Sequence, residues 1–271
     1  MNGHEAREQD QRENEKETPL DRGAKGHRGR ECKVRGRMST VQPMEFLTSP
    51  RLAGIGGLVH GFGLRVAGPR ATARAAAQAA FERAGGVFFL RQVHGCAVAS
   101  PPWIEPPDAD ASFTADTGLL LAIETADCLP ILIVDPANRR VAAAHAGWRG
   151  TVSRVAQAAV RSLIAAGSDP RQLVATLGPA IGPCCYEVGP EVEEAFGDPG
   201  RRFFVAGERN RKHLDVAAAN RAQLEEMGLP EANIERVDFC TRCREDLFFS
   251  YRRDGGNAGR MISVVGFSRP A

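Results

Sequence analysis

The sequence predicts an α/β protein built on a mixed β-sheet, and two patterns along its 271 residues indicate this class. Short apolar runs, typical of buried strands, recur along the chain between segments rich in helix-forming residues. The strands and helices alternate only in part, which favours a mixed sheet over a regular doubly wound one. With 43% hydrophobic and 25% charged residues, the composition is that of an ordinary globular protein. The length suits one large domain or two small ones.

A charged segment precedes the first apolar run. Residues 1–37 carry ten Lys/Arg and eight Asp/Glu, which accounts for the whole net charge of +2. They contain almost no large apolar side chain that could join a core, so we expect a disordered extension over 1–45. The globular domain is then expected over 46–271. Met38 stands just before the apolar pattern, which suggests the hypothesis that translation starts there.

The rest of the chain carries 25 basic and 25 acidic residues and is therefore neutral. Nucleic-acid binding needs a concentrated basic face, so we expect no nucleic-acid partner. No run of 18 apolar residues exists, which excludes a membrane-spanning helix, and the charged first 30 residues exclude a secretory signal. We therefore expect a cytoplasmic protein whose seven cysteines are not paired in disulfides. No long heptad pattern indicates assembly, so we expect a monomer.

The first elements follow from local composition. Residues 58–64 are short, apolar and Gly-rich, as in a strand with a tight turn. The Ala-rich segment 70–84 is strongly helix-forming, and Gly85 with Gly86 should end it. Residues 87–93 then indicate a strand that leads to a His-Gly pair.

Three apolar runs in the middle of the chain predict consecutive strands over 119–124, 131–135 and 141–144. Asn138 lies in the short turn between the second run and the third. Because so short a connection joins neighbouring strands, we expect these two to pair in antiparallel fashion.

The remaining elements complete an α/β pattern. Thr151 is expected to cap a helix that Gly167 ends, and a Gly-, Pro- and Cys-rich loop spans 178–190. Further strands are expected at 173–177, 234–239 and 261–267, and further helices at 191–196 and 215–227.

Three residues at predicted strand ends carry metal-binding chemistry: His94, Cys128 and His145. Two imidazoles and one thiolate with a fourth position open form the pattern of a catalytic zinc site. Alternatively, Cys128 is a nucleophile with His145 as its base. The third interpretation is a buried cysteine with two hydrogen-bonded histidines, because gaps of 34 and 17 residues form no compact metal motif.

A second cysteine pattern is weaker. Cys240 and Cys243 form a CxxC, and a structural zinc site would need a second pair. Cys184 and Cys185 are adjacent, so we expect their side chains to diverge, and this disfavours a four-cysteine zinc site. A redox role is also disfavoured, because no βαβ unit frames the CxxC.

Several arginines lie near Gly-rich turns, and Arg149, Arg252 and Arg253 are candidates for holding phosphate through two parallel hydrogen bonds. The alternative is that each is a solvated surface charge. The sequence contains no GxxxxGK[ST], GxGxxG, HExxH or GxSxG motif, which excludes the common nucleotide-binding, metalloprotease and serine-hydrolase signatures.

Several longer motifs occur in a fixed order. They are Gln92-Val93-His94-Gly95, Asp108-Ala109-Asp110-Ala111, Thr125-Ala126-Asp127-Cys128-Leu129-Pro130, His145-Ala146-Gly147-Trp148-Arg149-Gly150, the run 178–189, Cys240-Thr241, the run 248–254 and Gly259-Arg260. Together they resemble the YfiH-like family, which is known as the laccase-domain or multicopper polyphenol oxidase family, as purine nucleoside phosphorylase and as peptidoglycan editing factor PgeF. The resemblance spans residues 52–267.

This resemblance implies a single-domain layered α/β sandwich with a mixed sheet, related to cysteine-hydrolase-like bacterial toxins. It implies His94, Cys128 and His145 as metal ligands, with Zn²⁺ or Cu²⁺ as the ion. The implied activity is phosphorolysis of adenosine, inosine, guanosine and S-methyl-5′-thioadenosine, accompanied by adenosine deamination. On chemical grounds we add Asp127 as a proton shuttle beside the metal, and the three arginines as the phosphate ligands.

Three alternatives remain beside this activity. A multicopper oxidase needs many histidines, whereas the chain has six, two of them in the N-terminal extension. A Cys/His hydrolase acting on cell-wall precursor peptides, or a non-enzymatic editing factor in peptidoglycan precursor synthesis, stays open. The chain also departs from the family where Phe62-Gly63-Leu64-Arg65 runs almost directly into the Ala-rich helix, because this shortened loop bears on substrate range.

Overall fold

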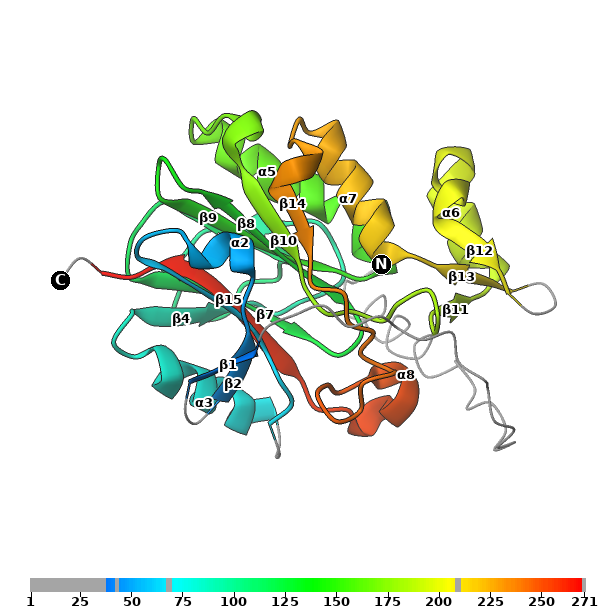
Figure 1. Cartoon of the computed structure of the whole chain (residues 1–271), viewed down its shortest axis with the longest axis horizontal. Helices are drawn as coiled ribbons and strands as arrows, with labels where there is room; N and C mark the ends of the chain where they lie inside the picture. Colours follow the sequence, from blue (N-terminus) through cyan, green and yellow to red (C-terminus); the bar gives the residue numbers. More distant parts are fainter. Residues whose placement is uncertain (1–37, 42–43, 67–69, 208–210, 270–271) are drawn as a thin grey trace, which may run out of the picture. The chain divides into compact units, whose positions relative to one another are not determined.

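The computed structural model describes residues 38–41, 44–66, 70–207 and 211–269 (Figure 1). All of them belong to one compact unit. Most of the extension expected over 1–45, and the segment before the hypothetical start at Met38, lie outside the described residues. The paired strands β1 and β2 begin before the expected domain boundary at residue 46.

The elements have the following bounds. The strands are β1 (Met38–Val41), β2 (Met44–Leu47), β3 (Leu58–Gly63), β4 (Gly86–Phe89), β5 (Val98–Ala99), β6 (Ala111–Thr114), β7 (Leu119–Thr125), β8 (Leu129–Asp135), β9 (Arg140–Ala146), β10 (Val174–Leu177), β11 (Glu187–Val188), β12 (Phe204–Ala206), β13 (Lys212–Leu214), β14 (Ile234–Arg236) and β15 (Met261–Phe267). The helices are α2 (Pro50–Ala53), α3 (Arg70–Phe81), α4 (Trp148–Val152), α5 (Val155–Ala165), α6 (Pro190–Gly200), α7 (Val216–Glu226) and α8 (Tyr251–Asp254). Among the described residues, no helix is both long and apolar enough to cross a membrane.

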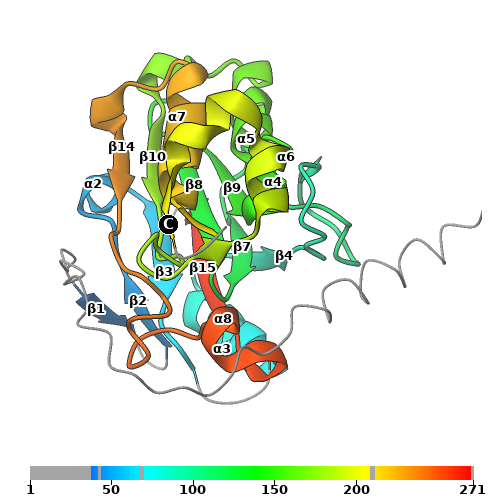
Figure 2. The same cartoon turned by 90° about the vertical axis from the view of Figure 1, so that its right-hand side faces the viewer.

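Two six-stranded mixed sheets form the framework, in the orders β1-β2-β3-β15-β7-β4 and β14-β10-β8-β9-β6-β5. Helix α3 covers the outer face of the first sheet, and α5 and α7 cover the outer face of the second (Figures 1 and 2). The predicted α/β sandwich is confirmed, but its strands are divided between two facing sheets. A small third sheet, β11-β13-β12, lies next to α6.

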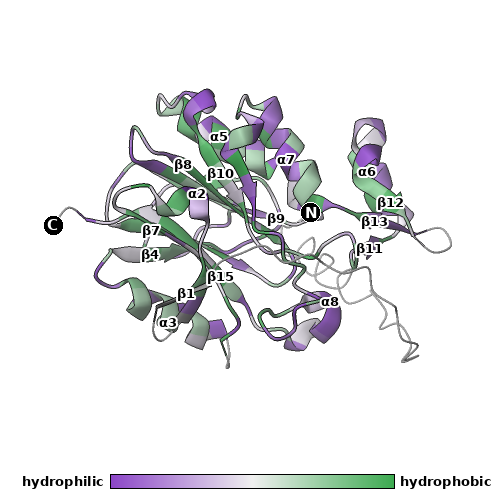
Figure 3. Cartoon of the chain, in the orientation of Figure 1, coloured by the Kyte–Doolittle hydropathy of each residue, from purple (hydrophilic) through white to green (hydrophobic). Residues whose placement is uncertain are grey.

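Residue alternation along the strands explains the layers. On β7, Leu120 and Ala122 pack toward α3, while Leu121 and Ile123 pack between the two sheets. Successive side chains of a strand point to opposite faces, and both faces are covered here, so the apolar run is continuous. Figure 3 shows this concentration of hydrophobic residues on the strands of the two large sheets.

The connection from β7 to β8 passes from one sheet to the other. Strand β7 pairs with β15 and β4, whereas β8 pairs with β9 and β10. The expected antiparallel pairing of the second and third central strands is confirmed by β8 and β9, with Pro130 opposite His145. The segment 126–128 therefore lies where the chain changes sheets, beside the end of β9.

The helix expected to start at Thr151 is different in the structure. Gly147 precedes the short helix α4, and Thr151 lies inside it, where its Oγ1 donates to the Gly147 carbonyl at 2.8 Å. Arg154 adopts a left-handed φ of 63° and separates α4 from α5. The expected end at Gly167 is confirmed, since α5 stops at Ala165 and Gly167 has a φ of +94°.

Candidate metal centre

The structure brings together the three strand-end residues that the sequence singled out. His94 lies in the loop after β4, Cys128 lies between β7 and β8, and His145 lies near the end of β9. Their potential ligand atoms all lie within 4.8 Å of one another, and the two imidazole centroids are 5.0 Å apart. We call His94, Cys128 and His145 the metal trio.

A buried carboxylate orients one imidazole of the metal trio. Asp110 Oδ1 lies 2.8 Å from His145 Nδ1, and both side chains are buried. This contact directs the other ring nitrogen, Nε2, toward Cys128 and His94. Hydrogen bonding of a ligand histidine to a carboxylate fixes its tautomer and increases its basicity. Sequence reasoning did not give Asp110 a role, although its motif was among the ordered segments.

Asp110 also shapes the turn that carries His94. Its carboxylate accepts hydrogen bonds from the backbone N–H groups of Val93, His94 and Gly95, at 3.1, 2.9 and 2.7 Å. His94 has a left-handed φ of 61°, a conformation that costs energy for most residues other than glycine. One carboxylate therefore holds both histidines of the metal trio.

Gly147 provides the space in which the metal trio converges. A Cβ atom at this position would lie 3.0 Å from Cys128 Sγ and 3.3 Å from His94 Cδ2. The backbone of Gly147 has an ordinary extended conformation, so the requirement for glycine here is one of space.

The electrostatics of the metal trio favour a thiolate. Burial raises the pKa of Cys128, but the imidazoles of His145 and His94 outweigh it and lower the pKa to about 6. Burial lowers the pKa of His145, but the Cys128 thiolate and Asp110 raise it to about 9. Both pKa shifts favour a thiolate on Cys128 beside a protonated His145.

The residues of the metal trio fit a zinc or copper ion. One sulfur and two imidazole nitrogens are donors that suit either metal. Tetrahedral ligands at bond lengths of about 2.0–2.3 Å lie roughly 3.3–3.8 Å apart. The ligand atoms of the trio all lie within 4.8 Å of one another, a limit that includes this range. Three protein ligands leave one coordination position for another molecule.

Asp127, the predicted proton shuttle, has a φ of 89° and a buried carboxylate. Its oxygens accept hydrogen bonds from Thr241 Oγ1 at 2.6 Å, Ser250 Oγ at 3.0 Å and the Arg252 N–H at 2.7 Å. Burial raises the pKa of Asp127, and these donors offset the effect only in part. Asp127, the residue directly before Cys128, is therefore hydrogen-bonded to Thr241 and to the segment 250–252, both late in the chain.

The three candidate phosphate ligands have different surroundings. Arg149 and Arg252 are exposed and lie over the rings of Trp148 and Tyr186, at 4.6 and 5.4 Å from the ring centroids. Arg252 Nη1 also donates to the Glu187 carbonyl at 2.7 Å. Both guanidiniums are therefore accessible to solvent.

The surroundings of Arg253 are more restricted. Its guanidinium forms an ion pair with Asp254 and donates to the carbonyls of Thr241, Arg242 and Phe248. These bonds use all five of its N–H groups. A phosphate on Arg253 would have to displace one of them.

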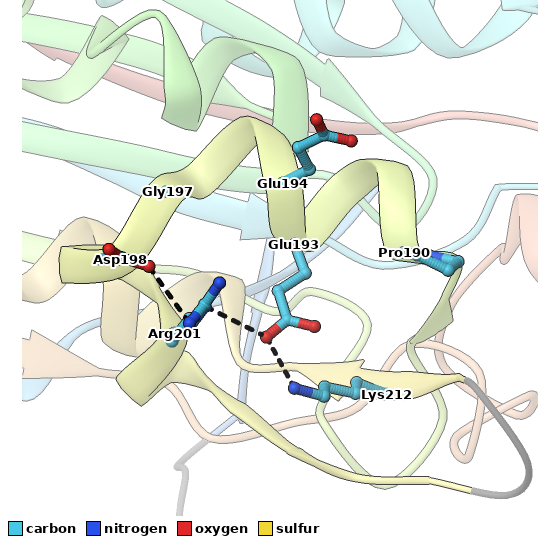
Figure 4. A pocket seen from close by; sticks show the side chains of 7 residues that line it. All are labelled: Pro190, Glu193, Glu194, Gly197, Asp198, Arg201 and Lys212. Atoms are coloured by element: carbon cyan, nitrogen blue, oxygen red, sulfur yellow. Dashed lines mark hydrogen bonds and ion pairs between the residues drawn. The ribbon is translucent and has the colours of Figure 1, made fainter.

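A cavity of about 760 Å³ lies beside α6, and Figure 4 shows the charged side chains around it. Glu193 pairs with Lys212 at 2.6 Å and with Arg201 at 3.7 Å, and Arg201 pairs with Asp198 at 3.1 Å. The metal trio does not line this cavity. Three carboxylates and two cations line the cavity, so its lining is acidic by one charge and does not suit an anion such as phosphate.

The four cysteines that the sequence disfavoured as a group also converge. The sulfur atoms of Cys184, Cys185, Cys240 and Cys243 all lie within 4.8 Å of one another. The expectation that the adjacent pair Cys184 and Cys185 diverges is therefore wrong, because the turn at 183–185 directs both sulfurs toward the same neighbours. We call these four residues the cysteine quartet.

Comparisons with known proteins agree with the ordered motifs. The family model described as Multi-copper polyphenol oxidoreductase laccase matches residues 65–268. A crystal structure of a Bacillus licheniformis hypothetical protein named YfiH superposes with a TM-score of 0.74 and 26% identity. The superposition covers 83% of this chain and 96% of that one. These matches confirm the resemblance that the motifs predicted.

Two relatives carry activity names. A purine nucleoside phosphorylase of Deinococcus radiodurans is 42% identical over 181 residues, which cover 66% of this chain and 70% of the relative. A protein named adenosine deaminase RL5, from an unknown prokaryotic organism, is 40% identical over 190 residues. That match covers 65% of this chain and 72% of the relative.

Proposed function

This chain belongs to the family of multi-copper polyphenol oxidoreductase laccases, and from that premise we propose that it is a zinc-dependent purine nucleoside phosphorylase. Its substrates would be adenosine, inosine, guanosine and S-methyl-5′-thioadenosine, with adenosine deamination as a second activity. The observation that carries the proposal is the metal trio, in which three protein ligands converge and one coordination position is left for a small molecule. The name of the first relative supports the phosphorolysis, and the name of the second supports the deamination.

Phosphorolysis exchanges one bond at the sugar for another. The C1′–N bond to the purine breaks, a C1′–O bond to phosphate forms, and the departing base takes up a proton. A zinc ion held by the metal trio supplies Lewis acidity and positive charge. The chain itself holds the two histidines in position through Asp110, and Asp127 beside Cys128 is the residue we assign to moving the proton.

Phosphate needs cationic hydrogen-bond donors near the metal trio. Arg149 follows His145 by four residues in α4, and the backbone N–H of Arg252 binds the carboxylate next to Cys128. Both guanidiniums are exposed and suit a phosphate oxygen pair. Arg253 is the weaker candidate, because its five N–H groups already have acceptors.

A multicopper polyphenol oxidase would need several copper ions with histidine ligands. Of the four histidines among the described residues, only His94 and His145 belong to a group that can hold a metal. His60 Nε2 instead accepts a hydrogen bond from the Ser49 N–H at 3.1 Å, and His213 lies 4.0 Å from Glu187. The histidines among the described residues therefore supply ligands to one site only, which disfavours the multicopper oxidase activity that the family name describes.

Product chromatography tests the proposal. The zinc-loaded full chain is incubated with adenosine, with and without inorganic phosphate, beside Cys128→Ala and the matched control Cys96→Ala. Cys96 is exposed and belongs to neither the metal trio nor the cysteine quartet. We expect adenine and ribose 1-phosphate only with phosphate, and a loss of at least about 1000-fold in Cys128→Ala.

Other products would change the assignment. Inosine formed without phosphate would assign deamination to the same metal trio. No product from adenosine, inosine or S-methyl-5′-thioadenosine would overturn the nucleoside proposal.

The geometry also favours one second candidate, a cysteine hydrolase. Cys128, His145 and Asp110 are arranged as nucleophile, base and orienting carboxylate, and the pKa of Cys128 is lowered to about 6. A hydrolase acting through this thiolate would keep its activity after metal chelation and lose it on thiol alkylation. The phosphorylase would lose activity under both treatments.

A further inference from the structure

The cysteine quartet lies on two loops that are distant in sequence. Cys184 and Cys185 are in the loop between β10 and β11, and Cys240 and Cys243 are in the loop after β14. Cys243 Sγ lies 3.7 Å from Cys184 Sγ and 3.4 Å from Cys185 Sγ.

Backbone hydrogen bonds hold the two loops together at the cysteine quartet. The Ala180 N–H donates to the Phe239 carbonyl at 3.3 Å, and the Thr241 N–H donates to the Ala180 carbonyl at 3.0 Å. The Gly182 N–H donates to Cys240 Sγ at 3.3 Å. Such a donor stabilises negative charge on sulfur, as the groups around metal-bound thiolates commonly do. These hydrogen bonds therefore hold the two cysteine-bearing loops against each other.

We propose that the cysteine quartet binds a structural zinc ion, separate from the metal trio. Four thiolates around zinc form a closed tetrahedral site with bond lengths of about 2.3 Å and sulfur–sulfur distances of roughly 3.8 Å. The observed separations of 3.4 and 3.7 Å and the common limit of 4.8 Å match this arrangement. Disulfide bonds would instead need sulfur atoms about 2.05 Å apart and would join the four residues only in pairs.

A zinc ion in the cysteine quartet would also support the metal trio. The Ile181 N–H donates to the Asp127 carbonyl at 2.9 Å, and Thr241 Oγ1 donates to the Asp127 carboxylate at 2.6 Å. One of these donors comes from each cysteine-bearing loop, and Asp127 precedes Cys128. The zinc ion therefore holds in place the two loops that bind Asp127, the residue before Cys128.

Metal counting tests this inference without relying on activity. The full chain is expressed with zinc, desalted and analysed for zinc per chain, as the wild type, Cys128→Ala, Cys243→Ser, the double variant and the control Cys96→Ser. We expect about two zinc ions in the wild type and the control, about one in each single variant and none in the double variant. Because Cys128→Ala removes a trio ligand, the zinc it retains reports the cysteine quartet even if the proposed nucleoside activity fails.

Alkylation of the unmodified chain keeps the test valid if a variant fails to fold. Cys184, Cys243 and Cys96 are all exposed, so burial does not protect them from iodoacetamide. We expect Cys184 and Cys243 to react at least about 10-fold more slowly before zinc removal than after it, because a bound thiolate is a weak nucleophile. The rate at Cys96 should not change.

Three outcomes would overturn the inference. They are a zinc-free Cys128→Ala protein, equal alkylation of Cys184 before and after chelation, and mass mapping that finds a disulfide within the cysteine quartet of the protein isolated under reducing conditions.

Discussion

The metal trio and the cysteine quartet differ in the number, kind and origin of their ligands. The trio takes one thiol and two imidazoles from three separate segments, and the buried carboxylate of Asp110 orients two of those segments. The quartet takes four thiols from two loops, and a backbone N–H from Gly182 supports it. The ligand atoms of both groups lie within the same limit of 4.8 Å, so this limit alone does not distinguish a reactive site from a structural one.

The difference in ligands has a consequence for charge. Zinc with one thiolate and two neutral imidazoles keeps a net charge of about +1, whereas zinc with four thiolates has about −2. The first combination attracts an anion such as phosphate and leaves a position for it. A zinc ion with four thiolates repels anions and has no free coordination position. We therefore expect changes in the trio to affect activity first, and changes in the quartet to affect stability first.

The largest expected effect comes from removing a trio ligand that contributes little to the core. In His94→Asn, kcat/KM for nucleoside phosphorolysis should fall by about 1000-fold or more, because the metal loses a ligand. Asparagine tolerates the left-handed φ of 61°, so the thermal unfolding temperature should change by less than about 2 °C. Steady-state kinetics and calorimetry measure both quantities.

For the quartet we expect the reverse, a larger loss of stability and a smaller loss of activity. Cys243→Ser should lower the unfolding temperature by more than His94→Asn does, and should reduce kcat/KM by less. If the two variants showed the same ratio of activity loss to stability loss, the division of roles between the two groups would be wrong.

A smaller effect is expected from Asp110→Asn, which keeps the trio ligands but removes the carboxylate behind them. We expect the metal affinity of the trio to fall about 10- to 100-fold, because His145 loses the acceptor that fixes its ring. Competition with a metal chelator measures this affinity. The matched control is Asp116→Asn, an exposed aspartate of the turn after β6, which should bind metal like the wild type. Unchanged affinity in Asp110→Asn would show that the trio does not depend on this carboxylate.

The smallest effect is expected from adding a methyl group at Gly147, next to the side chains of the trio. In Gly147→Ala, the new Cβ lies 3.0 Å from Cys128 Sγ, so the sulfur must move by a few tenths of an ångström. Metal affinity at the trio should fall about 10-fold, while zinc in the quartet should stay bound. Gly256→Ala is the control, because a Cβ there meets no atom within 4 Å. Loss of both zinc ions in Gly147→Ala would mean that the two groups are not independent.

Much of the fold could be predicted from the sequence because its signals are local. Strands β7 to β9 are buried almost throughout and appear as short apolar runs. Helix α7 begins after Asp215, whose Oδ1 accepts a hydrogen bond from the Ala218 N–H at 2.9 Å. The metal trio was also predictable, because its members stand at strand ends within recognisable motifs. The strand and helix signals depend on residues close together in the chain, whose spacing the backbone geometry determines. The members of the trio are 34 and 17 residues apart, and only their motifs indicated them.

The tertiary structure decided which distant residues meet. The sequence did not reveal that β7 and β8 belong to different sheets, that Asp110 holds both histidines, or that Cys184 and Cys185 face the CxxC pair. It also did not reveal that the N–H groups of Arg253 are already used by its own loop. Each of these contacts forms only when the sheets pack together and the loops take their final paths. No local periodicity encodes such contacts, because they depend on the free energy of the whole packed domain.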